Sequence, residues 1–304
     1  MSVFNNNTTM LTLSSPAKIN TYLYVTGKRA DGYHLLDTVF QLISLYDIVK
    51  LEVRNDGELV LHTPIKHLAD EQHLAVRAAR LLKTYTCTPL GANIWVDKYI
   101  PAGAGLGGGS SNAATTLMGL NALWRCGLSQ QQLQKIGVQL GADVPFFCSQ
   151  QGTAHAQGIG ELLTSLVTPS IYCVIIFPNI HVSTLTVFEH FNLTCKKKYA
   201  IISELPMQRK MFHFNKQFKN VLQIVAESLA PLIKEVVTVL EKTDNVNSIK
   251  MTGTGSAVFA TYLTEQAAES AAYQLKNICE YKQWFIWNVQ TLSSHPNPKE
   301  LFLG

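Results

Sequence analysis

A glycine-rich segment, PAGAGLGGGSSNAA at residues 101–114, has the composition of a phosphate-binding loop. Five of the seven residues from 103 to 109 are glycine, so the backbone can turn freely and its amides can approach an anion without a Cβ in the way. A helix expected to begin near Ser110 would point unpaired N–H groups and its positive dipole end into the same space. The hydroxyls of Ser110 and Ser111 could bind a phosphate oxygen or a magnesium ion, and either could equally be the helix N-cap. Residues 101–111, called the glycine loop below, are therefore predicted to bind phosphate.

Other phosphate loops also contain glycines at these spacings, and the residues around the loop discriminate among them. Gly103, Gly105 and Gly108 satisfy GxGxxG, but a dinucleotide-binding loop needs an acidic residue about 20 positions on, and residues 125–135 contain no Asp or Glu. A P-loop needs Lys directly after its last glycine, and a protein kinase needs HRD and DFG strings; none is present. A glycine-rich turn without a ligand remains an alternative. The pattern favours a small-molecule kinase over an NAD-dependent oxidoreductase.

Three further motifs are weak signals when each is taken alone. Asp143 in GADVPFF could be a catalytic base, or the N-cap of a short helix containing Pro145. Lys18 in SPAKIN stands at the head of a strand, where a lone lysine is usually a surface residue. DGYH at residues 31–34 predicts only a turn. Their meaning depends on whether they occur together with the glycine loop.

The hydrophobic pattern predicts the elements that position these motifs. Strands and hairpins are expected over 10–62, a helix over 72–83, a strand over 92–100, and a helix after the glycine loop with Ala113, Leu117, Leu120 and Trp124 on one face. Ser129 and Gln132 have the spacing of a capping box for a second helix.

Beyond about residue 165 the pattern of strands and helices begins again. We expect a strand at 172–177, helical stretches at 183–191 and 218–241, a strand pair around 253–255, a helix at 265–278 and a strand at 284–292. The sequence thus predicts an α+β protein of two lobes, residues 1–165 and 166–304, with a cleft between them.

Composition excludes several other classes of protein. Apolar residues make up 47% and charged residues 15% of the 304 positions, which is enough apolar material for a sizeable core. The net charge is +4 and the only basic run is at 196–198, so we expect no nucleic-acid partner. Residues 1–10 lack the pattern of a signal peptide, and no apolar run is long enough to span a membrane. Six scattered cysteines without CxxC pairs fit free thiols in a reducing compartment, so we expect a cytoplasmic protein. A homodimer is compatible with the sequence.

Taken together, the motifs resemble the GHMP superfamily of small-molecule kinases. The matching segments occur in the same order and cover nearly the whole chain: PAKIN at 16–20, DGYH at 31–34, the glycine-rich segment, LGADVPFF at 140–147 and TGTGSAVFA at 252–260. The glycine loop is typical of the superfamily. PAKIN with DGYH and GADVPFF resembles those members that act on a cytidine-diphosphate-linked methylerythritol.

The resemblance implies a two-lobed GHMP-kinase-like fold with ATP, Mg²⁺ and the substrate in the cleft between the lobes. It implies Asp143 as general base and Lys18 as the cation beside it. Substrate contacts would come from Asn20, from Tyr33 and Phe188 on the two faces of cytosine, and from His34 at its edge. The ATP contacts implied are Lys98, Pro101, Ala102, Gly103, Ala104, Gly105, Leu106, Gly107, Gly108, Gly109, Ser110, Ser111 and Asn112. The metal ligands are left unassigned.

Two positions depart from the pattern of the family. His73 stands where Asn is usual, which puts an adenine contact in doubt, and Ala102 replaces a common Met without expected consequence. The alternatives that remain open are another GHMP kinase, acting on mevalonate, homoserine or a sugar, and a nucleotide-binding homologue that transfers nothing. Retention of both Lys18 and Asp143 argues against the second, because a pure binder has no need of a base.

Overall fold

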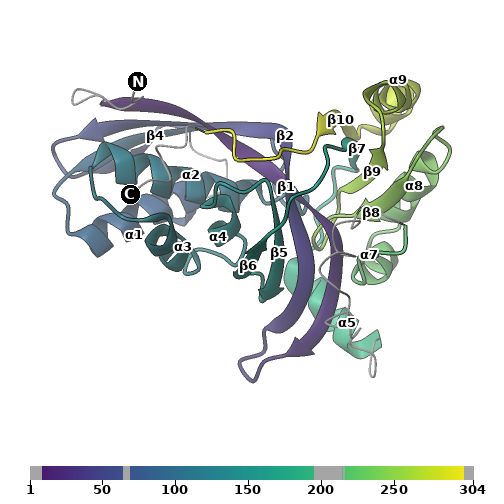
Figure 1. Ribbon diagram of the computed structural model, residues 1–304, viewed down its shortest axis with the longest axis horizontal. Helices are drawn as coiled ribbons and strands as arrows, with labels where there is room; N and C mark the ends of the chain where they lie inside the picture. The colour runs from purple at the N-terminus through teal and green to yellow at the C-terminus, as the bar shows by residue number, and fades with distance from the viewer. Residues whose placement is uncertain (1–8, 64–68, 195–213, 215, 298–304) are drawn as a thin grey trace.

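Two long antiparallel strands, β1 (Met10–Lys28) and β2 (His34–Arg54), run through both halves of the molecule (Figure 1). These elements belong to a computed structural model, which describes residues 9–63, 69–194, 214 and 216–297. Cys195 and the lysine run at 196–198 lie outside that part of the chain. The pairing of β1 with β2 shifts register between Pro16 and Ala17, and again between Asn20 and Tyr22. Such irregularities bend a strand and redirect its side chains, and Lys18 and Asn20 lie between them.

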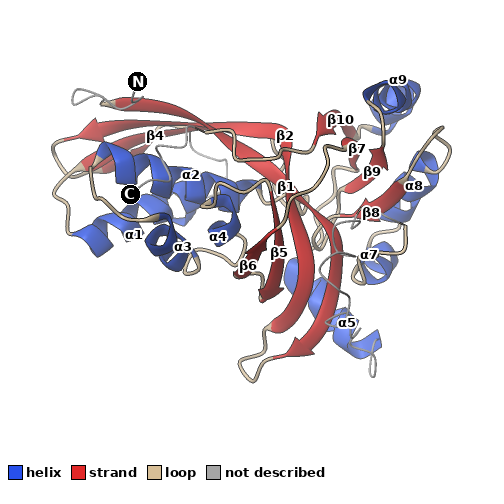
Figure 2. Cartoon of the chain, viewed as in Figure 1, coloured by secondary structure: helices blue, strands red, loops and turns tan. Residues whose placement is uncertain are grey.

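The first half is a mixed sheet covered on one face by helices (Figure 2). The sheet has six strands in the order β3-β4-β2-β5-β6, with β1 also paired to β2. Apart from β1 and β2, its elements are β3 (Leu59–Leu61), a 3₁₀ turn (Asp70–Gln72), α1 (Leu74–Thr86), β4 (Gly91–Asp97), α2 (Gly108–Leu123), α3 (Gln130–Gly137), α4 (Val144–Phe147), β5 (Thr153–Gly158) and β6 (Leu162–Ser165). One hydrophobic core lies between this sheet and helices α1 to α4.

The second half is a four-stranded antiparallel sheet with its own helices (Figure 1). The strand order is β10-β7-β9-β8. Its elements are β7 (Tyr172–Phe177), α5 (Thr184–Thr194), α7 (Gln223–Leu229), α8 (Leu232–Leu240), β8 (Ser248–Met251), β9 (Val258–Tyr262), α9 (Glu265–Lys282) and β10 (Phe285–Gln290). Leu23 and Val25 of β1 are buried in the core of this half, so the long hairpin belongs to both cores.

A third buried cluster joins the two halves. It combines Ala17 and Ile19 of β1, Ala104 and Leu106 of the glycine loop, and Phe259 of β9. The glycine loop and β1 are therefore packed directly against the second sheet. The candidate site lies where these elements meet.

Several predicted elements are confirmed. One predicted helix is wrong near its middle, where the structure has a break between two helices. The strand at 172–177 has the predicted bounds, and Ser129 and Gln132 form the predicted capping box at the start of α3. The helical stretch predicted at 218–241 is two helices, α7 and α8. Ala230 between them has φ −140°, and Pro231, which has no N–H to continue the α7 ladder, is the N-cap of α8.

Candidate active site

The glycine loop adopts conformations that favour glycine at three positions. Gly103, Gly105 and Gly107 have φ of +70°, +77° and +72°, a region that side chains with a Cβ rarely occupy. Helix α2 begins at Gly108 with Gly107 as N-cap, and no side chain caps it. The first N–H groups of a helix have no intrahelical acceptor, so the start of α2 offers unpaired donors and the positive end of its dipole to a ligand. Neither Ser110 nor Ser111 is the N-cap.

Both halves of the protein hold the loop in this shape through its carbonyl groups. Lys18 N donates to Leu106 O at 3.0 Å, and Ala257 N donates to Ala104 O at 3.1 Å. The hydroxyl of Thr252 donates to Gly105 O at 3.3 Å. Because three successive carbonyls already accept hydrogen bonds, the backbone of the loop is preorganised before any ligand arrives.

The side chain of Lys18 lies between Asp143 and Asn20. Its Nζ is 3.3 Å from Asp143 Oδ2 and donates to Asn20 Oδ1 at 2.6 Å. Lys18 is buried, whereas the Asp143 side chain is 30% exposed. Asp143 occupies the N-cap position of α4 but makes no capping hydrogen bond. Its carboxylate therefore pairs with a lysine and remains accessible to a ligand.

Asn20 is fixed on all sides by hydrogen bonds. Its Nδ2 donates to Thr38 Oγ1 at 2.9 Å, and its backbone N donates to Thr252 Oγ1 at 3.0 Å. The Lys18 contact occupies its side-chain oxygen. Thr252 thus contacts both β1 and the glycine loop, and places the polar end of Asn20 next to Lys18.

These residues share one cleft of about 340 Å³ between the two halves. It brings together most of the residues predicted from the sequence, and Leu36, Phe40, Leu74 and residues of the second half also border it. The predicted residues that line it are Lys18, Asn20, Pro101, Ala102, Gly103, Ala104, Gly105, Leu106, Gly107, Gly108, Gly109, Ser110, Asp143 and Phe188.

Three predicted ATP contacts do not line the cleft. Ser111 is fully buried, and its hydroxyl accepts a hydrogen bond from Ser15 Oγ at 2.8 Å. Asn112 is also buried and donates to Ser15 Oγ at 2.9 Å. Lys98 Nζ donates to Asn112 Oδ1 at 3.1 Å. Lys98 also packs against Gly108, because a Cβ added to Gly108 would be 3.1 Å from Lys98 Nζ. In this structure the three side chains are part of one hydrogen-bonded network at the start of α2, on the side away from the cleft.

The sequence analysis missed Asp47, which organises this support. Its carboxylate is fully buried and accepts hydrogen bonds from the backbone N–H groups of Tyr99 at 2.7 Å and Ile100 at 2.8 Å. It also accepts from Asn112 Nδ2 at 2.9 Å and forms an ion pair with Lys98. Asp47 therefore ties the chain before the glycine loop to the helix after it. The available signal in the sequence was an aspartate followed by the apolar residues Ile48 and Val49 of a strand. Such a position is expected to be buried, and a buried carboxylate requires hydrogen-bond or charged partners.

The residues predicted to hold cytosine come from the tip of the β1–β2 hairpin and from α5. Tyr33 is 61% exposed at the tip of the hairpin. The imidazole of His34 stacks on Phe188, with ring centroids 4.6 Å apart. No ring contact joins Tyr33 to Phe188 in the described part of the chain. The structure thus brings His34, rather than Tyr33, onto the face of Phe188.

His73 is the N-cap of α1. Its Nδ1 accepts a hydrogen bond from Ala75 N at 3.2 Å. Burial, followed by the charge of Lys98, lowers the pKa of His73, which favours the neutral imidazole that this capping bond needs. An Asn could cap the helix in the same way.

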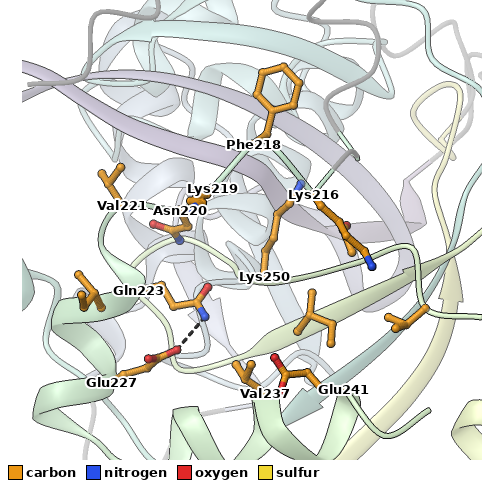
Figure 3. Close-up of a pocket in the computed structure, with 14 residues that line it drawn as sticks. Lys216, Phe218, Lys219, Asn220, Val221, Gln223, Glu227, Val237, Glu241 and Lys250 are labelled. Atoms are coloured by element: carbon orange, nitrogen blue, oxygen red, sulfur yellow. Dashed lines mark hydrogen bonds between the residues drawn. The ribbon is translucent and has the colours of Figure 1, made fainter. Parts of the chain in front are cut away.

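A larger hollow of about 760 Å³ lies in the second half, between α7, α8 and β8 (Figure 3). Lys216, Lys219 and Lys250 border it, and Gln223 is hydrogen-bonded to Glu227 there at 2.7 Å. It contains none of the residues predicted for the site. Lys250 extends from it to donate to Thr21 O at 2.9 Å, next to Asn20.

The described residues lack two further features, a metal-binding cluster and a membrane-spanning helix. No group of three or more His, Cys, Asp or Glu side chains there is arranged to hold a metal ion. None of the helices described is both long and apolar enough to cross a membrane.

Comparison with known proteins identifies the class to which this fold and cleft belong. The sequence matches the GHMP kinases N-terminal domain over residues 73–151 and the GHMP kinases C-terminal domain over 203–280. A crystal structure of 4-(cytidine 5'-diphospho)-2C-methyl-D-erythritol kinase superposes with a TM-score of 0.76 at 32% identity, covering 92% of this chain and 99% of that one. A homoserine kinase from Cytophaga hutchinsonii has a TM-score of 0.73 at 14% identity, covering 97% and 98% of the two chains, and shows the shared fold alone. The protein is a GHMP kinase.

Relatives at higher identity narrow the assignment. The 4-diphosphocytidyl-2-C-methyl-D-erythritol kinase of Herminiimonas arsenicoxydans is 41% identical, over 93% of this chain and 95% of that protein. That of Neisseria meningitidis serogroup A is 40% identical, over 93% and 95%. The chain belongs to the 4-diphosphocytidyl-2-C-methyl-D-erythritol kinase family.

Proposed function

We propose that the protein transfers the γ-phosphoryl group of ATP to the 2-hydroxyl of 4-diphosphocytidyl-2-C-methyl-D-erythritol, a step of non-mevalonate isoprenoid precursor biosynthesis. The observation that carries the proposal is the pairing of Lys18 with Asp143, at 3.3 Å, in the cleft bordered by the glycine loop. The names and high coverage of the relatives favour the cytidine-linked substrate.

In the proposed reaction Asp143 is the general base. A substrate alcohol is a poor nucleophile, so its proton passes to the Asp143 carboxylate as its oxygen bonds to the γ-phosphorus. The bond from that phosphorus to the oxygen bridging it to the β-phosphate breaks, and ADP leaves. Lys18 supplies positive charge beside the base, and Asn20 holds Lys18 and contacts the substrate.

The glycine loop binds the phosphates of ATP in this proposal. Its carbonyls are already engaged by Lys18, Thr252 and Ala257, so the donors at the start of α2 need little rearrangement to receive the transferring group. Preorganised donors of this kind stabilise developing charge at little reorganisation cost. Residues 101–110 are the proposed ATP contacts, whereas Lys98, Ser111 and Asn112 act through the support they give α2.

Mg²⁺ fits the residues that border the cleft. It keeps several waters and takes phosphate oxygens, so it needs few ligands from the protein. Ser110 offers a hydroxyl at the start of α2. Ser110 would hold the ion together with phosphate oxygens and waters, and the ion would supply charge neutralisation for the phosphates.

The chain is organised as two lobes and is placed in the cytoplasm. Residues 1–165 and 166–304 form the two lobes, with one sheet in each and the hairpin of β1 and β2 reaching into the second. Cytoplasmic location is supported by the five described cysteines, all free thiols.

The experiment is a coupled ADP-release assay with purified protein, ATP and Mg²⁺. The acceptors are the cytidine-linked methylerythritol, methylerythritol phosphate without cytidine, mevalonate and homoserine. Release of ADP with the cytidine-linked compound alone is expected. Preference for mevalonate or homoserine would reassign the protein within the GHMP kinases, and no release with any acceptor would favour a binding homologue.

A further inference from the structure

His181 lies directly over the glycine loop, although it belongs to the other half of the chain. A Cβ atom placed on Gly103 would be 2.0 Å from His181 Nδ1 and 2.8 Å from its Cε1. The imidazole thus fills the space that a side chain at position 103 would need. Gly103 lines the cleft that contains Lys18 and Asp143. The ring of His181 is therefore packed against a glycine of the loop that borders the candidate active site.

The residues on either side of His181 hold it in this place. The carbonyl of Ile180 accepts a hydrogen bond from Ser256 Oγ, and Val182 is buried in the core of the second half. His181 between them is exposed. Three residues later α5 begins at Thr184, which also lines the cleft. Position 181 is thus fixed by a buried neighbour and a hydrogen-bonded one, while its side chain is free to contact a ligand.

The ring nitrogens of His181 are available for hydrogen bonding. Within the part of the chain that the structure describes, neither nitrogen has a hydrogen-bond partner. A histidine can donate from at least one ring nitrogen in either protonation state. The start of α2, which follows Gly107 of the same loop, offers backbone N–H groups. Donors from both halves of the chain therefore adjoin the glycine loop.

We propose that His181 is a phosphate-binding residue that donates a hydrogen bond from its imidazole to a phosphoryl oxygen of the ligand on the glycine loop. This inference rests on the proposed function, in which that oxygen belongs to ATP or to the diphosphate of the cytidine-linked substrate. Hydrogen bonds to charged oxygens are stronger than neutral ones. Loss of the imidazole should weaken phosphate binding about tenfold, which corresponds to about 1.4 kcal/mol.

The test is calorimetric binding of ADP, CDP, adenosine and cytidine to wild-type protein and to three variants. His181→Ala removes the donor, and His181→Asn retains a side-chain N–H. His190→Ala is the matched control, because His190 is an exposed histidine of α5 that is hydrogen-bonded to the carbonyl of Thr186 in its own helix. His181→Ala should bind ADP or CDP about tenfold more weakly and bind the nucleosides normally. His181→Asn should recover part of the loss, and His190→Ala should match the wild type.

The two nucleotides identify the source of the phosphate. Weakened binding of ADP alone assigns the contact to the nucleotide, and weakened binding of CDP alone assigns it to the acceptor substrate. Unchanged binding of both, or an equal loss for nucleotides and nucleosides, would overturn the proposal. Because binding is measured without turnover, a protein that fails to phosphorylate the cytidine-linked alcohol still reports on His181, so the two failures are distinguishable.

Discussion

The imidazole of His34 stacks on the ring of Phe188, with centroids 4.6 Å apart and planes inclined by 14°. His34 begins β2 and Phe188 lies in α5, so this contact connects the two lobes at one end of the cleft. Phe188 lines the cleft. A planar base that replaces His34, or that stacks on the other face of Phe188, would use Phe188 as its flat surface.

Replacing Phe188 with Leu is therefore expected to weaken binding of the cytidine-linked substrate by ~1–2 kcal/mol, because apolar bulk remains but the aromatic face is lost. Affinity for ATP should stay within about twofold by calorimetry. Tyr85→Leu serves as the control, since Tyr85 is an exposed aromatic residue of α1 away from the cleft. Equal binding of the cytidine-linked substrate by Phe188→Leu and wild type would remove Phe188 from the substrate site.

Gly107→Ala should weaken ATP binding by at least tenfold. An added Cβ would lie 2.9 Å from the Phe147 ring and 3.1 Å from Lys18, at a φ of +72° that disfavours any side chain. Gly127→Ala is a matched control, because Gly127 has φ +67° but no atom within 4 Å of the added Cβ. Both variants should lose about 1–2 kcal/mol of stability from the backbone strain. If Gly107→Ala binds ATP as well as Gly127→Ala does, phosphate is held elsewhere.

Lys18→Met should lower kcat far more than it raises KM for ATP, because Lys18 contacts the proposed base rather than only the nucleotide. Met retains most of the buried volume. Lys50→Met is the control, since Lys50 forms a comparable ion pair with Asp97, at 2.9 Å, on the surface. Steady-state kinetics should show Lys50→Met unchanged. A change confined to KM in Lys18→Met would make Lys18 a binding residue.

The free energy of unfolding should rise with pH just above neutrality, because the amino group of Lys250 is buried. Burial lowers the pKa of Lys250 to about 7 from 10.5, so between these values the unfolded chain binds more protons than the folded one and the free energy of unfolding increases with pH. Buried Cys148 and Cys173, whose pKa values burial raises, oppose this trend above about pH 9. Urea unfolding should give a gain on the order of 1 kcal/mol between pH 7 and 8.5.

The variant Lys250→Met should lose that slope, because Met has no proton to release and also no longer donates to Thr21 O. The exposed Lys242, replaced by Met, provides the control and should keep the wild-type slope. An unchanged slope in Lys250→Met would show that Lys250 keeps its proton in the folded protein throughout this pH range, which would contradict the lowered pKa.

Sequence patterns predicted the elements and motifs well where the signal is local. The capping box of Ser129 and Gln132 and the strand at 172–177 depend on neighbours in the chain, and both are confirmed. The glycine loop was predicted from composition, because few residues tolerate its positive φ values. The long-range hydrogen bonds were not predictable. The Asp47 carboxylate accepts hydrogen bonds from Ile100 N and Asn112 Nδ2. The Thr252 hydroxyl accepts one from Asn20 N and donates one to Gly105 O. Such contacts arise from packing of distant segments, for which a single sequence has no local pattern.

The same limit applies to the directions of individual side chains. Ser110 lines the cleft, and the sequence did not indicate that the neighbouring Ser111 is hydrogen-bonded to Ser15 instead. The order of Tyr33 and His34 around Phe188 likewise depends on how the hairpin tip approaches α5.

The central claim, phosphoryl transfer to the 2-hydroxyl with Asp143 as base, is tested most directly by ³¹P NMR of reactions run with wild type and with Asp143→Asn. Wild type with ATP, Mg²⁺ and 4-diphosphocytidyl-2-C-methyl-D-erythritol should produce ADP and one new phosphomonoester signal, assigned to the 2-position by its coupling to carbon. Asp143→Asn should bind ATP within a few-fold of wild type and produce no such signal on the same timescale. A phosphomonoester at another position, or product formed by Asp143→Asn at a rate near that of wild type, would contradict the account.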